Sequence, residues 1–122
     1  SYPAGHAVLA GAIATILKLF FADAAWSTTG LPVVESTDGV SRTAYVGGDL
    51  TSMSIHGEIN KLASNIAIGR NFAGVHYRSD GDQGILLGEK VAIQYFKDLR
   101  AGANEDIGTI ALTKFDGTIE NV

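Results

Sequence analysis

The sequence predicts a mainly α-helical fold, in which three principal helices form part of a larger helical bundle and are accompanied by two short β-hairpins. Apolar residues recur at helical spacing in three long segments. Asp-Gly pairs at 38–39 and 116–117 lie between short β-prone runs, which is a hairpin signal. The length of 122 residues is that of one domain, so we treat 1–122 as a single segment.

The first predicted helix runs from Gly5 or His6 to Phe21. Its body, AVLAGAIATILKLFFA, is apolar on nearly every face and carries Lys18 as its only charge. This run is shorter than the roughly 20 residues of a membrane span, so we predict a buried helix and no membrane span. A helix of this kind needs neighbours on most sides, and the rest of the chain offers about two more helices. We therefore expect part of the natural core to be missing from this chain.

A hairpin and a second helix are predicted next. The hairpin is LPVVES-TDG-VSRTAYV, residues 31–46. Thr51, Ser52 and Ser54 are candidate N-caps for the helix, which is expected to end near Ala73 with Gly74 as its terminating residue. Its predicted inner stripe consists of Ile55, Ile59, Leu62, Ala63, Ile66 and Ala73. His56 has no companion motif, and we predict that it lies on the helix surface.

Asp80 is the predicted N-cap of a third helix that runs to about Arg100. Gly84 and Gly88 are four residues apart, a spacing that would let another backbone approach closely. The predicted inner face is Val91, Ala92, Tyr95, Phe96 and Leu99, and the predicted outer face is Glu89, Lys90, Gln94, Lys97 and Asp98. The tail, TIALTKF-DG-TIENV, predicts the second hairpin.

Composition excludes several classes of protein. Hydrophobic residues make up 46% and charged residues 18%, values typical of a globular chain and not of a disordered one. There is no cysteine, which excludes disulfides and thiolate metal sites. The net charge is −4 and no run of lysine or arginine is present, so we expect no nucleic-acid partner.

The stretch SYPAGH has the features of an anion-binding helix start. Gly5 and His6 would lie at the N-terminus of the first helix, where backbone amides have no intrahelical partner and the helix dipole favours an anion. Gly5 carries no side chain to obstruct a ligand. His6 can donate or accept a proton near pH 7.

Arg70 and His76 are a second candidate pair. They are six residues apart, and in one unbroken helix their side chains would point about 240° apart. If the helix ends near Gly74, the chain can turn back and both can face one point. Arg70 could then present its guanidinium to oxyanion oxygens, and His76 could attack or coordinate the central atom. Capping or surface roles for the two histidines remain the alternative, because Gly74 would also suit an ordinary helix end.

Two longer stretches carry a family resemblance. SYPAGHAVLAGAIATILK and GEINKLASNIAIGRNFAGVHYRSDGDQGILLGE resemble the C-terminal part of vanadium-dependent haloperoxidases, in particular the bromoperoxidases of marine algae and their bacterial relatives. These enzymes belong with the type 2 phosphatidic acid phosphatases and bacterial acid phosphatases. The resemblance covers roughly 1–26 and 54–100, and its specific element is Pro-x-Gly-His followed by Arg-x5-His within Gly-x-His-Tyr-Arg. It implies a helical bundle with vanadate as the cofactor.

The resemblance also implies an activity and a role for each motif residue. The activity is oxidation of halide, with bromide favoured, by hydrogen peroxide. His76 would be the metal ligand, while Arg70, Gly5 and His6 would complete the cofactor-binding set. The catalytic residues would be His6, which handles protons of peroxide and water, and His76. The vanadium would act as a Lewis acid.

The sequence departs from the family pattern in two ways. The residue before Gly-His is Ala4 where the family has a serine, and losing a hydrogen bond to a charged group costs about 1.5–3 kcal/mol. The family also has an upstream lysine followed by Arg-Pro, which this sequence does not contain. The chain opens without methionine directly at the motif, so we expect a mature, processed or truncated product. Another chain or a missing N-terminal segment would complete the site, and the apolar first helix predicts a homo-oligomer.

Two other functions stay open from the sequence. One is a histidine-dependent acid or phospholipid phosphatase that forms a phosphohistidine at His76, since phosphate and vanadate are both tetrahedral oxyanions. The other is a non-catalytic helical assembly fragment, which the missing Lys/Arg element and Ala4 favour.

Overall fold

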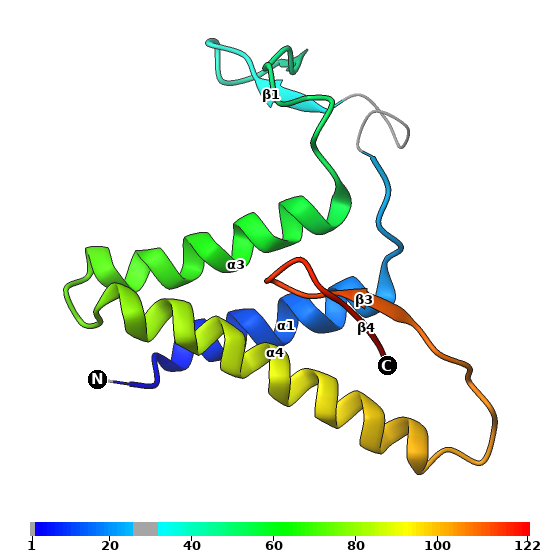
Figure 1. The fold of residues 1–122 in the computed structure, drawn as a ribbon. Coiled ribbons are helices and arrows are strands. Elements are labelled where there is room, and N and C mark those ends of the chain that lie inside the picture. The colour runs from blue at the N-terminus through cyan, green and yellow to red at the C-terminus, as the bar shows by residue number, and fades with distance from the viewer. Residues whose placement is uncertain (1, 26–31) are drawn as a thin grey trace.

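Three helices lying against one another form the body of the computed structural model, which describes residues 2–25 and 32–122 (Figure 1). The helices are α1 (Gly5–Phe20), α3 (Ile55–Phe72) and α4 (Arg78–Ala101). The hairpins pair β1 (Val33–Glu35) with β2 (Arg42–Ala44) and β3 (Ala111–Thr113) with β4 (Ile119–Asn121), both antiparallel. The prediction of a mainly helical fold with three helices and two hairpins is confirmed.

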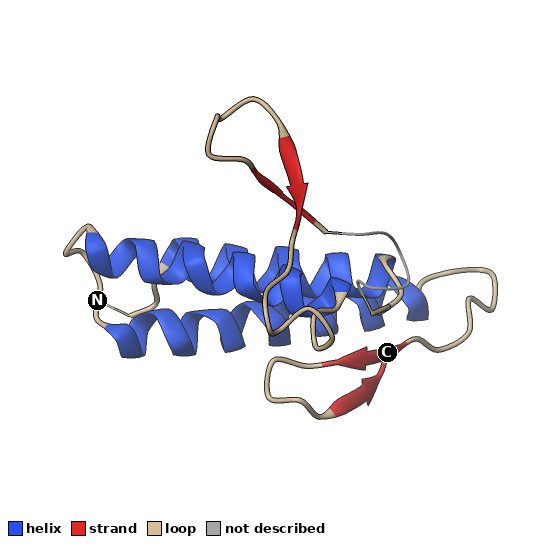
Figure 2. Cartoon of the chain, turned by 90° about the horizontal axis from the view of Figure 1, so that it is seen from above, coloured by secondary structure: helices blue, strands red, loops and turns tan. Residues whose placement is uncertain are grey.

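The two hairpins differ in how they attach to the helices. The β1–β2 hairpin projects away from them, and all six of its strand residues are exposed (Figure 2). The predicted hairpin segment begins at Leu31, which lies outside the described residues. The β3–β4 hairpin instead packs its buried Leu112, together with Val122, against Ile93 of α4.

Small residues hold α1 against α4. An added Cβ would lie 2.7 Å from the backbone nitrogen of Ala12 at Gly88, and 2.8 Å from Cα of Ile85 at Gly11. Real Cβ contacts are almost never that short, so these positions require glycine for the observed approach. Gly84 faces α1 in the same way. The close approach predicted from Gly84 and Gly88 is confirmed.

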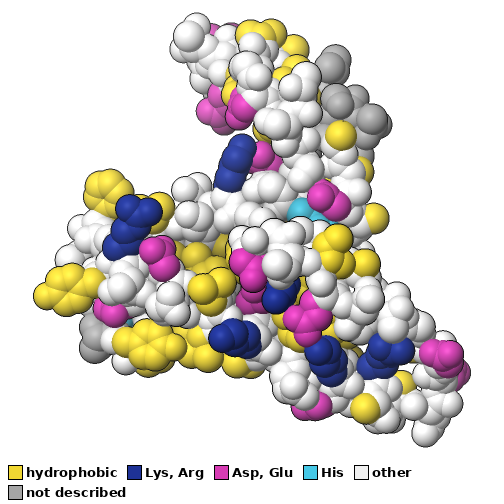
Figure 3. All heavy atoms as spheres, in the orientation of Figure 1, with side chains coloured by type: hydrophobic (Ala, Val, Ile, Leu, Met, Phe, Trp, Pro, Cys, Tyr) yellow, Lys and Arg dark blue, Asp and Glu magenta, His cyan; other side chains and the backbone are white. Residues whose placement is uncertain are grey.

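The prediction that α1 is buried on most sides is wrong for this chain. The buried face of α1 consists of Ala7, Ala10, Gly11, Ala14, Thr15 and Lys18. Its large apolar side chains are exposed instead: Leu9, Ile13, Ile16 and Phe20. The reason is that a close helix crossing needs small residues at the contact, which turns the bulky ones outward. Apolar side chains accordingly gather on the surface of the helical part (Figure 3).

Helix α3 begins and ends as predicted. The Ser54 hydroxyl accepts a hydrogen bond from the Gly57 amide at 3.1 Å, so Ser54 is the N-cap. The helix ends at Phe72, and Gly74 has a left-handed φ of 71°. The inward face differs from the predicted stripe, since its buried residues are His56, Ala63 and Ala67, while Leu62 and Ile66 are exposed.

Helix α4 starts earlier than predicted and faces the core differently. Its N-cap is Tyr77, and Asp80 is the third residue of the helix, so the predicted N-cap role of Asp80 is wrong. The buried residues are Asp80, Gly81, Gly84, Gly88, Glu89, Ala92 and Ile93. Val91, Tyr95 and Leu99, which were predicted to face inward, are exposed. The small residues of α4 that contact α1 determine which face of α4 is buried. Its large apolar residues do not determine this, and several of them face solvent.

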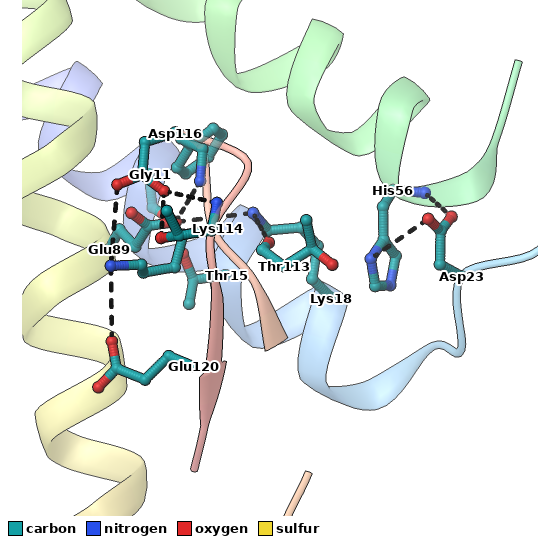
Figure 4. A network of polar contacts seen from close by, with 12 residues as sticks. Gly11, Thr15, Lys18, Asp23, His56, Glu89, Thr113, Lys114, Asp116 and Glu120 are labelled. Atoms are coloured by element: carbon teal, nitrogen blue, oxygen red, sulfur yellow. Dashed lines mark hydrogen bonds and ion pairs between the residues drawn. The ribbon is translucent and has the colours of Figure 1, made fainter. Parts of the chain in front are cut away.

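A buried ion pair fastens the C-terminal hairpin to the helices (Figure 4). Lys18 Nζ lies 3.7 Å from Glu89 Oε1 and donates a 2.9 Å hydrogen bond to the carbonyl oxygen of Thr113. Glu89 Oε1 accepts a 2.8 Å hydrogen bond from the Phe115 amide, and the ammonium also lies 4.0 Å from the centre of the Phe115 ring. Burial lowers the pKa of Lys18, and the Glu89 carboxylate opposes that shift. The predicted outward placement of Glu89 is therefore wrong.

Substituting Gly88 with alanine should destabilise the fold even though alanine is the better helix former. The added methyl group would force α1 and α4 apart, and overpacking of this kind costs about 1–3 kcal/mol. The free energy of unfolding is measured by urea denaturation followed by circular dichroism. Gly69→Ala in α3 is the matched control, because an added Cβ there meets nothing within 4 Å; it should gain about 0.5–1 kcal/mol. Equal stability of Gly88→Ala and wild type would contradict the close crossing.

Substituting Lys18 with methionine should also destabilise the fold, because Glu89 would remain buried without its cation. Removing one partner of a buried pair costs about 3–5 kcal/mol. The same denaturation assay checks this. Lys61→Met is the control, because Lys61 pairs with Glu58 at 2.7 Å with half of its side chain exposed, and little change is expected. If both substitutions had the same small effect, the ion pair would not fasten the hairpin.

Candidate functional site

The predicted site residues lie on elements that meet at one end of the helical body. The N-terminus and the α3–α4 connection are at the same end in both views (Figures 1 and 2). Side chains of Ala4 and Ala7 form a buried cluster there with Ala67 of α3. Gly5 and His6, the first residues of α1, share this end with the connection that follows Arg70 and carries His76.

The chain reverses direction directly after Arg70. The Gly74 amide donates to the Asn71 carbonyl at 2.9 Å, and the Val75 amide donates to the Arg70 carbonyl at 3.3 Å. Together with the left-handed φ of Gly74, these bonds close the end of α3 and start the short connection to α4. The predicted turn between Arg70 and His76 is thus present, and the two residues do not belong to one continuous helix.

Polar atoms in this turn are buried without a hydrogen-bond partner among the described residues. They are Nε of Arg70, Nδ1 of His76 and Oδ1 of Asn71. A buried guanidinium donor without an acceptor is costly, about 1–3 kcal/mol or more for a charged group. An oxyanion offers several acceptor oxygens, and Arg is the side chain best suited to bind them. The unpaired Nε donor of Arg70 therefore fits a bound oxyanion, whereas Oδ1 of Asn71 is an acceptor and adds nothing to such a site.

Asp80 contacts both His76 and the start of α4. Its Oδ2 accepts a 3.1 Å hydrogen bond from the Tyr77 amide and lies 3.5 Å from His76 Nδ1. The side chains of His76 and Asp80 are 15% and 12% exposed. The bond from the Tyr77 amide holds the pKa of Asp80 below its usual range. Sequence reasoning missed this contact; the signal was the i,i+4 spacing of His76 and Asp80.

The first turn of α1 is open to a ligand on the Gly5 side. A Cβ added at Gly5 would meet nothing within 4 Å, and both Gly5 and His6 are exposed. The N-cap residue Ala4 provides no side-chain cap, and the first turn contains no acidic residue. Backbone amides there are available to an anion. Ala4 itself is fully buried, so its side chain faces the alanine cluster.

The third histidine has a structural role. His56 is 7% exposed, so its predicted surface position is wrong. Its Nε2 lies 2.7 Å from the Phe21 carbonyl oxygen, and its backbone amide donates to Asp23 Oδ1 at 3.0 Å (Figure 4). These bonds tie the end of α1 to the start of α3. Only His6 and His76 remain as candidate site histidines.

Residues 2–25 and 32–122 contain no cluster of three or more His, Cys, Asp or Glu side chains able to hold a metal ion. None of their helices has both the length and the apolar character needed to cross a membrane. That Gly5, His6, Arg70 and His76 bind one oxyanion together stays a prediction.

The family model and the curated relatives that match this chain point to the same protein family. Residues 1–105 match the family model described as the VCPO second helical-bundle domain. The chain is 45% identical to the vanadium-dependent bromoperoxidase of Corallina officinalis and 44% identical to that of Corallina pilulifera, each over 118 residues, which is 97% of this chain and 19% of the relative. Identity to the vanadium-dependent bromoperoxidase of Ascophyllum nodosum is 46% over 95 residues, which is 77% of this chain and 16% of that protein.

These matches include segments beyond the two motif stretches, since they extend through the β1–β2 hairpin. The chain spans about a fifth of the length of the curated relatives it matches. A family model over most of the chain and identities of 44–46% over long alignments agree with each other and with the helical fold. The chain belongs to the vanadium haloperoxidase family, in which it corresponds to the second helical-bundle domain.

Proposed function

We propose that this chain supplies part of the vanadate site of a haloperoxidase that oxidises halide, with bromide favoured, by hydrogen peroxide. The relatives named as vanadium-dependent bromoperoxidases support the reaction class. The observation that carries the proposal for this chain is the buried Nε of Arg70, which has no acceptor among the described residues and lies six residues before His76. An oxyanion bound beside Arg70 would accept a hydrogen bond from this Nε–H.

Each residue has a distinct task in this proposal. His76 would bind the vanadium through a ring nitrogen, and Arg70 would donate hydrogen bonds to vanadate oxygens. The amides at the start of α1, beginning with Gly5, would add donors and the favourable end of the helix dipole. When bound, vanadate supplies a Lewis acid that activates hydrogen peroxide toward halide. His6, exposed at the same end, would act as the acid–base group that handles protons of peroxide and water.

Further polypeptide is needed to complete such a site. Arg70 is the one cation among the four predicted residues, and Ala4 offers no hydroxyl. The lysine and the second arginine implied by the family resemblance would have to come from outside these 122 residues. An exposed apolar face of α1 and α3 supports this view, because it is the kind of surface that another helix would cover: Leu9, Ile13, Ile16, Phe20, Leu62 and Ile66. We call this set the open face.

A groove within the open face is suited to an apolar partner. It runs between α1 and α3 and is lined by Ile13, Leu17, Ile59, Leu62 and Ile66, with alanines at its floor. Covering a large apolar side chain contributes about 1.5–3 kcal/mol. When no other polypeptide is present, we expect two copies of this chain to associate through the groove.

Removing His76 or Arg70 should abolish or weaken vanadate-dependent bromination by the assembled protein. His76→Ala removes the proposed ligand, and activity should fall to background. Arg70→Ala removes a charge-assisted hydrogen bond worth about 1.5–3 kcal/mol, so vanadate affinity should fall about 10- to 100-fold. Bromination of a phenol-red-type dye with added vanadate, peroxide and bromide measures both effects.

Arg78→Ala is the matched control, because Arg78 follows His76 closely but its side chain is 87% exposed and forms an ion pair with Asp82. It should retain activity. Undiminished bromination by His76→Ala would contradict the proposal. Phosphate-ester hydrolysis that needs no added vanadate and is inhibited by it would instead favour the phosphatase alternative.

Polar substitutions on the open face should reduce self-association of the isolated chain. Ile13 and Leu62 are 54% and 57% exposed and line the groove from opposite helices. Ile13→Glu with Leu62→Glu would remove two apolar contacts of about 1.5–3 kcal/mol each, so the dimer dissociation constant should rise more than about 100-fold. Sedimentation velocity measures this constant. Val40→Glu on the β1–β2 hairpin is the control, because Val40 is 91% exposed but lies off the helices. A wild-type chain that is monomeric at all concentrations would contradict the association.

A further inference from the structure

We infer that Tyr77 and Tyr2 form a modification site: hypobromous acid that leaves the candidate site would brominate these two phenol rings before the other tyrosines of the chain. This inference rests on the proposed function, because that function supplies the brominating agent. It also names a class of organic substrate, the phenols, of which the protein itself carries the nearest examples.

Both chemical steps balance without a further reagent. Hydrogen peroxide takes two electrons from bromide, so that bromide, peroxide and one proton give hypobromous acid and water. A phenol reacts at a ring carbon next to the one that bears its oxygen. This carbon forms a bond to bromine, while the oxygen–bromine bond breaks and leaves its electron pair on oxygen. The ring carbon then releases its proton, so the second product is water.

Tyr77 and Tyr2 lie at the end of the helical body that carries the candidate site (Figure 1). Tyr77 follows His76 directly, so their Cα atoms are about 3.8 Å apart. Its backbone is extended, and side chains alternate in extended chain. The His76 side chain is accordingly 15% exposed, whereas Tyr77 is 80% exposed. Tyr2 is 58% exposed and precedes Gly5 by three residues. Both phenols are therefore open to a small molecule that leaves this end.

Tyr95 is a distant reference with a matched surface. It is 62% exposed, nearly the same as Tyr2. It is 17 residues beyond Arg78, the first residue of α4, which is about 25 Å along the helix axis. Tyr2 and Tyr95 therefore differ mainly in their distance from the candidate site.

Tyr45 is a second distant reference and is the less reactive one. It directly follows β2, on the hairpin that leads to the start of α3, whereas the candidate site is at the other end of that helix. Its hydroxyl donates a 2.5 Å hydrogen bond to Asp49 Oδ1, and this bond raises the pKa of Tyr45. Less of its phenol is ionised at a given pH, and the ionised form is the one that reacts faster with an electrophile.

Exposure alone and distance from the source give different orders of reaction. Hypobromous acid added from bulk solution would reach Tyr77 first, and Tyr2 and Tyr95 about equally, because their exposures are 80%, 58% and 62%. A species that diffuses from a point source is most concentrated near that source. Hypobromous acid made at the candidate site should therefore modify Tyr2 ahead of Tyr95. The ratio of bromination at Tyr2 to that at Tyr95 separates the two cases.

The experiment incubates the assembled protein with vanadate, hydrogen peroxide, bromide and an excess of a phenol-red-type dye. The dye removes hypobromous acid that escapes into bulk solution and reports turnover at the same time. A reference sample receives hypobromous acid itself in place of peroxide. Mass spectrometry then measures bromotyrosine in tryptic peptides, and cleavage after lysine and arginine places each tyrosine in its own peptide: 1–18, 43–61, 71–78 and 91–97.

We expect Tyr77 and Tyr2 to be modified first during turnover, with a Tyr2-to-Tyr95 ratio several-fold above one. The ratio in the reference sample should be close to one. Tyr77→Phe should lose the bromine in peptide 71–78 and keep dye bromination, because phenylalanine lacks only the phenol oxygen. Tyr95→Phe is its matched control and should leave peptides 1–18 and 71–78 modified as in wild type. His76→Ala should lose dye and tyrosine bromination together.

Dye bromination with a Tyr2-to-Tyr95 ratio near one would overturn the inference and leave the proposed function standing. So would a Tyr77 that stays unmodified in both samples, because other polypeptide would then cover it in the assembled protein. An assembled protein that brominates neither dye nor tyrosine would overturn both. Bromination of the tyrosines in the reference sample would then show that the rings are reactive and that the proposed function is what failed.

Discussion

The close crossing of α1 and α4 is the constraint on which the rest of the structure depends. Backbone meets backbone at Gly11, Gly84 and Gly88, where even one methyl group would not fit. This contact sets how both helices are rotated about their axes. It also brings the first turn of α1 to the end where α3 turns into α4, because Gly84 packs beside Ala7 there. The candidate site is thus a consequence of how two helices cross.

The same crossing leaves the large apolar side chains of α1 on the surface. A helix can turn only one face toward a close neighbour, and here that face carries alanine, glycine and a buried lysine. Leu9, Ile13 and Phe20 are therefore more than half exposed in this chain. Monomeric proteins rarely expose so much contiguous apolar surface. The open face and the incomplete set of cations lead to the same expectation, which is that other polypeptide packs on this domain.

Local signals predicted the elements well, whereas contacts between elements were mostly not predicted, apart from the close approach at Gly84 and Gly88. The Ser54 cap, the left-handed Gly74 and the Asp-Gly turns depend on a few neighbouring residues, so the sequence indicates them directly. The buried state of Glu89 and His56 depends on partners far along the chain, Lys18 and Phe21. The buried face of α4 was predicted wrongly from its large apolar residues, because small residues, Gly81, Gly84, Gly88 and Ala92, make up most of that face. For the candidate site, the motifs predicted Gly5, His6, Arg70 and His76, whereas the contact of Asp80 with His76 was missed although their i,i+4 spacing is a signal for it.

The net charge at the candidate site is too small to hold an oxyanion without further cationic side chains. Arg70 contributes one positive charge, Asp80 one negative charge, and the starts of α1 and α4 roughly half a positive charge each. The sum is only about one positive charge, which is little for an oxyanion that must leave water. Asp80 cannot be given up without losing its contact to His76, so the balance must be restored by added cations. A site that keeps a carboxylate 3.5 Å from its histidine therefore requires more lysine and arginine than this chain places there, and we expect these residues to arrive with the polypeptide that covers the open face.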